Sequence, residues 1–298
     1  MAMSQDVGMA TVAQWIEGAR PRTLPNSISP VLVGAGAARA IGQFVWWQAV
    51  VALVVALALQ VGVNYANDYS DGIRGTDANR VGPFRLVGSG AARPKAVLAA
   101  AVACLGVAAL AGLVLVAATG LWWLLLVGAA CIAAAWYYTG GKRPYGYSGF
   151  GEVAVFVFFG LIGVLGTLYV QSGRITLVGV AGAVGVGVFS SAVLVANNLR
   201  DIPTDRETGK RTLAVLLGDR NTRVLYCALV AVPFVITLLC APGNPWVLVG
   251  LLALVPVIPS VRTVAGGTTG RALIPVLRDT GLGMLAWSAI TAVALALA

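Results

Sequence analysis

The chain has 298 residues, of which 59% are hydrophobic and 10% are charged, with a mean hydropathy of +0.88. Because a soluble domain carries about 25% charged residues, this composition excludes an ordinary soluble globular protein and favours a helical membrane protein. The formal charge of +9 indicates basic loops that set membrane topology and bind anions, rather than a surface for nucleic acid.

The first predicted element is a short amphipathic stretch at residues 11–20, which is expected to lie on the membrane surface. Residues 1–10 lack a basic stretch and a cleavage site, so no secretory signal is expected. Nine apolar runs follow, each long enough to cross a bilayer as a helix. They cover residues 24–41, 46–68, 96–117, 121–139, 149–170, 175–198, 223–240, 245–262 and 280–297.

These runs predict an all-α membrane protein, since the ten-residue alternation of a membrane β-barrel is absent. We expect a single domain over residues 1–298, with an N-terminal segment at 1–22 and a helical bundle at 23–298. Four cysteines lie inside apolar runs without CxxC spacing and are expected to be packing residues: Cys104, Cys131, Cys227 and Cys240. The chain has no histidine, which excludes His-ligated metals and Ser-His or Cys-His catalytic pairs.

The distribution of cations predicts the orientation in the cell membrane. Every Lys and Arg except Arg39 and Arg174 lies in the N-terminal segment, in the loops after the second, fourth, sixth and eighth spans, or at the adjoining span ends. The positive-inside rule therefore places the N-terminus and these loops in the cytoplasm and the C-terminus outside. Most acidic residues lie on the same side. Because acidic residues contribute little to membrane orientation, their position on this side needs another explanation.

The first acidic motif closes the second span. Four polar residues have the spacing i, i+3, i+4 and i+7, which places them on one helical face: Asn64, Asn67, Asp68 and Asp71. Gly72 and Gly75 are then expected to end the helix and begin a loop that contains Asp77.

The second motif closes the sixth span. It contains the residues Asn197, Asn198, Arg200, Asp201 and Asp205. Pro203 is expected to break or kink the helix, so that Asp205 lies on a bent or restarted turn.

The two motifs align as Asn67 and Asp71 with Asn197 and Asp201, on spans that run in the same direction. This similarity indicates a weak parallel repeat, in which each of two bundles contributes one motif. A lone aspartate at a helix end is usually a cap or a solvated loop residue, but a matched pair of clusters favours a shared site.

Oxygen ligands rich in carboxylates suit Mg²⁺, which keeps several waters and is completed by a substrate phosphate. Basic residues near both motifs are candidates to bind phosphate oxygens, although such residues can also serve only as topology signals. They include Arg74, Arg80, Arg85, Arg93, Lys95, Arg200, Arg206, Lys210 and Arg211. The sequence therefore predicts a magnesium–diphosphate site that faces the cytoplasm.

Both motifs resemble the signatures of the UbiA superfamily of intramembrane prenyltransferases, and flanking segments resemble its branch that prenylates 1,4-dihydroxy-2-naphthoate in menaquinone synthesis. These segments are residues 19–25, 67–72, 75–77, 82–87, 147–156 and 197–201. The resemblance covers about residues 15–295.

The resemblance implies nine helices around a central cavity, Mg²⁺ as cofactor, and polyprenyl diphosphate with 1,4-dihydroxy-2-naphthoate as substrates. It assigns the metal site to Asn67, Asp68, Asp71, Asn197, Asp201 and Asp205, with Asn64 and Asn198 beside it. Many superfamily members carry an aspartate where this chain has Gly75, and whether Asp77 takes that role is open. The implied reaction joins the prenyl group to the naphthoate ring, releases carbon dioxide and gives demethylmenaquinone.

Candidate residues for the aromatic acceptor and the allylic cation are less specific. Lys142, Arg143 and Tyr145 follow the fourth span, and Glu152 begins the fifth. Lys142 and Arg143 equally fit a positive-inside pair, and interfacial tyrosines fit an aromatic belt. Aromatic faces that could stabilise the cation are those of Tyr65, Tyr69, Tyr137, Tyr138 and Phe156.

Two alternatives remain open from the sequence. One is another aromatic acceptor, such as 4-hydroxybenzoate, homogentisate or a tetrapyrrole. The other is a small-anion membrane transporter, which a parallel repeat with carboxylates would suit. The sequence does not determine the prenyl chain length, the catalytic base or the oligomeric state.

Overall fold

The computed structural model describes residues 10–75 and 84–297, and within these ranges all regular structure is helical. The helices of the N-terminal half are α1 (Val12–Ala19), α2 (Pro25–Ala40), α3 (Trp46–Arg74), α4 (Pro94–Thr119), α5 (Leu124–Tyr137), α6 (Gly151–Val155), the π-helix η3 (Phe156–Leu165) and α7 (Gly166–Ser172). Those of the C-terminal half are α8 (Leu177–Glu207), α9 (Leu213–Cys240), η4 (Pro245–Ala253), α10 (Leu254–Ala265), η5 (Gly270–Leu273) and α11 (Ile274–Ala296). Short 3₁₀ turns, η1 (Pro21–Thr23) and η2 (Tyr145–Tyr147), lie in the connections.

The prediction of an all-α, multi-pass membrane protein is confirmed. Within the described residues, seven helical stretches are long and apolar enough to cross a membrane: α3, α4, α6–α7, α8, α9, η4–α10 and η5–α11. α5 is apolar but has only 14 residues, and α2 has 16. The predicted count of nine spans is therefore not confirmed by length and composition.

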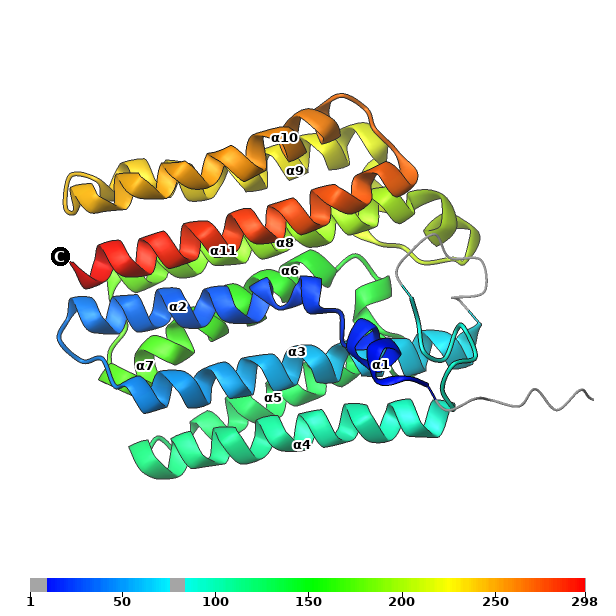
Figure 1. Ribbon diagram of the computed structural model, residues 1–298, viewed down its shortest axis with the longest axis horizontal. Coiled ribbons are helices and arrows are strands. Elements are labelled where there is room, and N and C mark those ends of the chain that lie inside the picture. The colour runs from blue at the N-terminus through cyan, green and yellow to red at the C-terminus, as the bar shows by residue number, and fades with distance from the viewer. Residues whose placement is uncertain (1–9, 76–83, 298) are drawn as a thin grey trace, which may run out of the picture.

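The helices run side by side along the long axis of the molecule (Figure 1). α8, α11 and α2 occupy the middle, α9 and α10 form one edge, and α3, α4 and α5 form the other. α1 lies beside the motif end of α3, where the Trp15 and Tyr65 rings meet edge to face at 5.5 Å. The amphipathic stretch is therefore held against the bundle.

Glycine allows the closest helix approaches. A side chain at Gly160 would lie 2.6 Å from the Gly187 Cα atom, so η3 and α8 touch backbone to backbone. α2 and α11 meet in the same way at Gly36, next to Ala292. Small residues at such crossings give dispersion contacts that lipid cannot supply.

Some helix ends follow the sequence signals and one does not. α3 ends at Gly75, whose φ of 72° is the left-handed conformation that glycine adopts without strain. The predicted break at Pro203 is wrong, since α8 continues through it to Glu207. Pro203 removes one backbone donor near the helix end, and the Thr204 hydroxyl donates to the Asp201 carbonyl at 3.0 Å.

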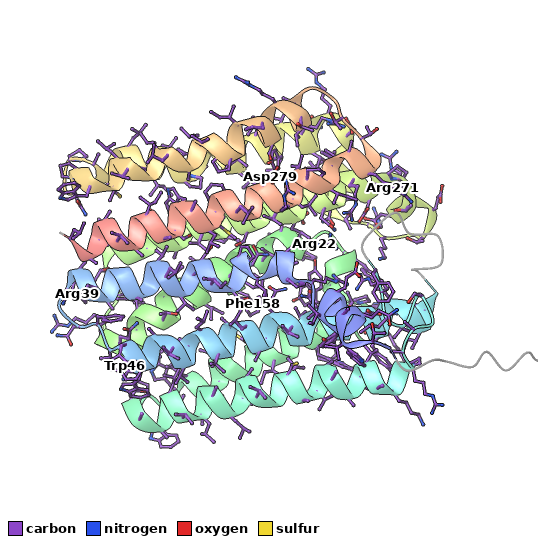
Figure 2. The ribbon with its side chains drawn as sticks, in the orientation of Figure 1. Arg22, Arg39, Trp46, Phe158, Arg271 and Asp279 are labelled. Atoms are coloured by element: carbon purple, nitrogen blue, oxygen red, sulfur yellow. The ribbon has the colours of Figure 1, made fainter. Side chains whose placement is uncertain are left out.

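The two ends of the bundle differ in chemistry (Figure 2). Arg39 and Trp46 lie at one end, and Arg271 lies at the other, where both motifs are found. Trp46, Trp122 and Trp123 are exposed at or near the first end, as expected for side chains at a membrane interface.

Candidate active site

A cavity of about 900 Å³ lies inside the bundle, and both motifs line one end of it. Asn64, Asn67 and Asp71 enter from α3, and Asn197, Asn198, Arg200, Asp201 and Asp205 enter from α8. The remaining wall is largely apolar and comes from α3, α4, α5 and η3. It includes Leu59, Val116, Leu125, Phe158 and Ile162. A charged end joined to a long apolar chamber suits an amphiphile with an anionic head.

In the first motif, Asn67 and Asp71 are one helical turn apart and both face the cavity. The side-chain Oδ1 of Asn67 accepts a 2.6 Å hydrogen bond from the Thr139 hydroxyl. The Asp71 carboxylate accepts from Arg85, at 3.3 Å, and from the Tyr147 hydroxyl. Asp71 is only 3% exposed, so these donors fix its orientation.

Asp68 does not line the cavity, although the spacing predicted it on the same face. Its carboxylate is fully buried and accepts the backbone N–H groups of Leu86, at 2.7 Å, and Val87, at 3.0 Å. The side chain therefore anchors the turn that carries Arg85 to Asp71. Its contact with the site is indirect.

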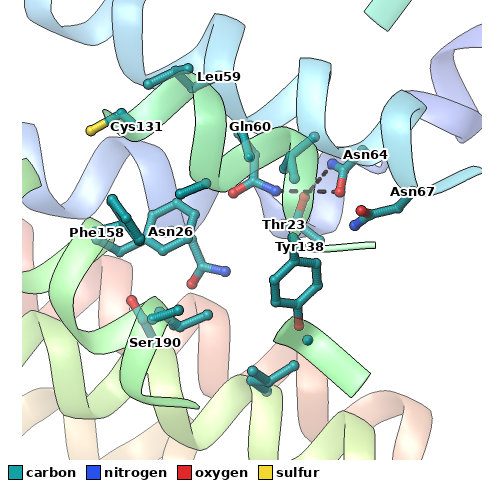
Figure 3. A pocket seen from close by; sticks show the side chains of 18 of the residues that line it. Thr23, Asn26, Leu59, Gln60, Asn64, Asn67, Cys131, Tyr138, Phe158 and Ser190 are labelled. Atoms are coloured by element: carbon teal, nitrogen blue, oxygen red, sulfur yellow. Dashed lines mark hydrogen bonds between the residues drawn. The ribbon is translucent and has the colours of Figure 1, made fainter. Parts of the chain in front are cut away.

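Asn64 holds the N-terminal segment in place. Its amide nitrogen donates to the Ala19 carbonyl and to the Thr23 hydroxyl, both at 2.9 Å. Gln60 donates to the side-chain Oδ1 of Asn64 at 3.3 Å, and Figure 3 shows Gln60, Asn64 and Thr23 in this chain of contacts beside Asn67. Asn64 thus positions the turn from which Arg20 and Arg22 reach the cavity.

The second motif is held by its own arginine. Arg200 donates two hydrogen bonds to the Asp201 carboxylate, from Nε to Oδ1 at 2.7 Å and from Nη2 to Oδ2 at 2.6 Å. It also donates to the side-chain Oδ1 of Asn197 at 2.9 Å. Asp205 accepts from the Thr212 hydroxyl at 3.4 Å. Both aspartates are 8% exposed, so they lie in a poorly hydrated end of the cavity.

The loop between α5 and α6 closes over both motifs. Tyr138, Thr139, Tyr145 and Tyr147 all line the cavity from it. Burial and the neighbouring Asp71 carboxylate raise the pKa of Tyr147, so its hydroxyl remains a donor at neutral pH. Burial also raises the pKa of Tyr145 to about 12, and this hydroxyl donates to the Ala134 carbonyl at 2.9 Å.

Several predicted contacts do not reach the cavity: those of Tyr69, Arg74, Lys142, Arg143, Glu152 and Arg211. Arg74 binds the carbonyls of Thr139 and Gly141 and so supports the loop. Lys142 and Arg143 are exposed, as in the positive-inside interpretation. Asp77 and Arg80 lie outside the described residues.

Glu152 is buried behind the cavity wall. Its Oε1 accepts from Asn198 at 2.8 Å, and Asn198 does line the cavity. Glu152 therefore orients a cavity residue without facing the cavity itself.

The sequence interpretation gave no role to Arg20, Arg22, Gln60, Thr139 and Tyr147, which all line the cavity. Arg20 and Arg22 had a usable signal, since they form a basic pair directly after the amphipathic stretch on the cytoplasmic side. Thr139 and Tyr147 had none, because their importance depends on tertiary contacts.

The donor set at this end of the cavity consists of amide and carboxylate oxygens, which suit Mg²⁺. Among the described residues, no three or more His, Cys, Asp or Glu side chains form a ready metal cage. Mg²⁺ is usually bound through one or two carboxylates, with water and substrate phosphate completing its shell, so these residues fit it.

Comparison with known proteins identifies the architecture. The model of the UbiA prenyltransferase family matches residues 27–272, which is most of the chain and includes both motifs. The chain belongs to the UbiA prenyltransferase family. It is therefore a membrane-embedded transferase, and the transporter alternative is set aside.

Several relatives within this family carry the same name. The protein is 59% identical, over 97% of its length and 98% of the relative's, to 1,4-dihydroxy-2-naphthoate octaprenyltransferase of Mycobacterium tuberculosis. It is 38% identical to the protein of the same name from Escherichia coli, over 72% of each chain.

Solved UbiA homologues share the fold. An apo structure from Aeropyrum pernix superposes with a TM-score of 0.67 at 17% identity, covering 91% of this chain and 97% of the homologue. A homologue from Archaeoglobus fulgidus, bound to DMAPP and Mg²⁺, superposes with a TM-score of 0.61 at 14% identity, covering 96% and 100%.

Proposed function

We propose that this UbiA-family protein transfers a polyprenyl group from polyprenyl diphosphate to 1,4-dihydroxy-2-naphthoate. The observation that carries the proposal is one cavity whose charged end holds both motifs and whose remainder is apolar. The charged end suits a diphosphate, and the apolar chamber suits an isoprenoid tail. The choice of acceptor is supported by the name of the mycobacterial relative at 59% identity.

Mg²⁺ is the proposed cofactor, held by Asn67, Asp71, Asn197, Asp201 and Asp205. The Mg²⁺ bound to the archaeal homologue supports this choice. When bound, the ion supplies positive charge that stabilises the departing diphosphate. Asp68 supports the site from behind by fixing the turn that carries Arg85.

The chain's cations would bind the remaining phosphate oxygens. Arg85, Arg200 and Lys210 line the charged end, and guanidinium groups match phosphate geometry. Arg85 and Arg200 are buried and Lys210 is half-buried, and limited access of water would protect a reactive allylic carbon from hydrolysis.

The bonding changes balance as a substitution with decarboxylation. The C1–O bond of the prenyl diphosphate breaks, and a bond forms between C1 and the ring carbon that carries the carboxylate. The bond from that carbon to the carboxylate then breaks, and carbon dioxide leaves while its electron pair restores the aromatic ring. The product of the transfer is the quinol, and a separate two-electron oxidant such as dioxygen converts it to demethylmenaquinone. Of the candidate acceptor contacts, Tyr138 and Tyr145 line the cavity, whereas Lys142 and Arg143 do not.

The proposed site faces the cytoplasm. The support is the charge distribution, since Arg39 and Arg174 are the cations of the opposite side. A cytoplasmic opening gives access to soluble acceptor, while the tail enters from the bilayer.

The direct test is prenyl transfer by purified protein, with product mass measured for diphosphates of several lengths and for several aromatic acids. We expect a decarboxylated prenyl naphthoquinol that forms with Mg²⁺ and disappears with EDTA. Asp71→Asn and Asp201→Asn should each lower the rate roughly 100-fold or more. Asp279→Asn is the matched control, since this aspartate pairs with Arg278 outside the cavity.

Two results would overturn parts of the proposal. Transfer to 4-hydroxybenzoate but not to the naphthoate would make the acceptor wrong. Full activity of folded Asp71→Asn and Asp201→Asn variants would make the metal assignment wrong.

A further inference from the structure

Tyr147 contacts both halves of the site. It lies in η2, in the loop between α5 and α6, and faces the cavity. Its hydroxyl donates to Asp71 of the first motif. Its ring and its backbone carbonyl contact the segment that follows the second motif, at Lys210 and Arg211. Within the described cavity wall, these contacts join two segments more than 130 residues apart in sequence.

The hydroxyl contact orients a carboxylate. Tyr147 donates to Oδ1 of Asp71 and Arg85 donates to Oδ2, so each oxygen has a fixed donor. The Tyr147 and Arg85 donors hold the plane of this carboxylate, and a carboxylate with about four lone-pair sites can bind a cation while it accepts hydrogen bonds. Donors of this kind orient metal ligands, and their loss typically lowers metal affinity about 10- to 100-fold.

The ring of Tyr147 positions the ammonium group of Lys210. The Lys210 ammonium lies 4.5 Å from the centroid of the Tyr147 ring, within the range of a cation–π interaction. The Arg211 N–H donates to the Tyr147 carbonyl at 2.9 Å, and the Lys210 N–H donates to the Asp205 carbonyl at 2.8 Å. The segment after α8 therefore packs against Tyr147, and Lys210 lines the charged end of the cavity.

We propose that Tyr147 is a positioning residue that couples the two motifs, with its hydroxyl setting the metal-binding geometry of Asp71 and its ring setting the diphosphate contact of Lys210. The inference rests on the proposed function, which makes Asp71 a metal ligand and Lys210 a diphosphate contact. It assigns the two effects to different parts of one side chain, so that they separate by substitution.

Tyr147→Phe removes the hydroxyl and keeps the ring, whereas Tyr147→Leu removes both. Mn²⁺ binding is measured by electron paramagnetic resonance with bound geranyl thiolodiphosphate, an unreactive analogue. Affinity for the analogue alone is measured by calorimetry without metal. For Tyr147→Phe we expect Mn²⁺ affinity to fall about 10-fold, while metal-free analogue affinity stays within about twofold.

For Tyr147→Leu we expect both affinities to fall, the analogue by roughly 2- to 30-fold. Lys210→Gln should lower the affinity for the analogue in the wild-type background. In the Tyr147→Leu background it should cause little further loss of affinity, because Lys210 is then already misplaced.

Tyr226→Phe is the matched control. Tyr226 is a buried tyrosine whose hydroxyl bonds to Thr280 at 2.7 Å, in the part of the bundle away from the cavity. It should lower the melting temperature without changing either affinity, which separates positioning from general stability.

The outcomes distinguish the two claims. Wild-type protein that bound neither Mn²⁺ nor the analogue would overturn the proposed function. Wild-type protein that bound both, with unchanged Mn²⁺ affinity in a folded Tyr147→Phe variant, would overturn the role of Tyr147 alone. Equal losses of both affinities in Tyr147→Phe would contradict the division between hydroxyl and ring.

Discussion

Asp68 and Asp71 are three residues apart on α3, and their carboxylates have different surroundings. Asp71 lines the cavity and accepts from the Arg85 and Tyr147 side chains, whereas Asp68 accepts from the backbone N–H groups of Leu86 and Val87 in the following turn. Three residues of an α-helix correspond to about 300° of rotation, so the two side chains point about 60° apart, and Asp68 lies at the edge of the shared face, where it reaches that turn. The two carboxylates therefore have separable roles.

Substitution of each by asparagine tests this difference. Asp68→Asn leaves one of the buried N–H groups of Leu86 and Val87 without an acceptor, so we expect a loss of about 1–3 kcal/mol of stability. Asp71→Asn should instead raise the Mg²⁺ concentration needed for half-maximal activity, with a smaller change in melting temperature. Thermal unfolding in detergent and metal titrations measure both effects, and the reverse pattern would contradict the assignment.

At the residue scale, the sequence predicted which residues lie near the site better than it predicted where their side chains point. The i, i+4 spacing correctly brought Asn67 and Asp71 to the cavity, because helix geometry alone determines their common face. It misplaced Asp68, whose partners are backbone groups of a turn that only tertiary structure positions. Tyr147 was missed for the same reason, since its partners lie on α3 and on the segment after α8.

At the scale of elements, η3 and α8 pack more closely than ordinary side chains allow. A Cβ atom at Gly160 would lie 2.6 Å from the Gly187 Cα atom and 2.7 Å from the Ala183 carbonyl oxygen. Neither neighbour is a flexible side-chain end, so the helices would have to separate. This contact supports the wall from which Phe158 and Ile162 line the apolar chamber.

Gly160→Ala should therefore destabilise the protein by about 1–3 kcal/mol, the usual effect of overpacking. Gly106→Ala on α4 is the control, since nothing lies within 4 Å of its added methyl group. It should be neutral or slightly stabilising because alanine favours helix. Melting temperatures of the two purified variants make the comparison, and equal values would show that the close approach carries no cost.

Helix existence was predictable and several helix ends were not. The predicted second span stops at residue 68, but α3 continues to Arg74, and α8 passes its predicted end to reach Glu207. Hydropathy detects the part of a helix that lies in lipid, whereas backbone hydrogen bonding continues through polar residues. The extra turns are the ones that carry Asp71, Asp201 and Asp205, so the site lies where hydropathy gives no signal.

On the scale of the whole molecule, exposed residues at the two ends of the bundle allow a test of the proposed membrane orientation. Gln43 lies in the exposed connection after Arg39, and Arg271 lies in η5 at the opposite end. In a background without the native cysteines, we expect Gln43→Cys to react with an impermeant maleimide in intact cells. Arg271→Cys should react only after the cells are permeabilised, and reversed labelling would invert the proposed topology.

The pairing of Arg200 with Asp201 has a consequence for the order in which ligands bind. Each charge compensates the other inside a buried site, where an unpaired charge is costly. A cation that binds Asp201 in place of Arg200 makes Arg200 available to bind an anion. In the same way, an anion that binds Arg200 makes Asp201 available to bind a cation. By thermodynamic linkage each ligand then raises the affinity of the other by the same factor. In the proposed site, metal and diphosphate would thereby be reciprocal effectors, and the level of free magnesium would set the apparent affinity for the prenyl donor.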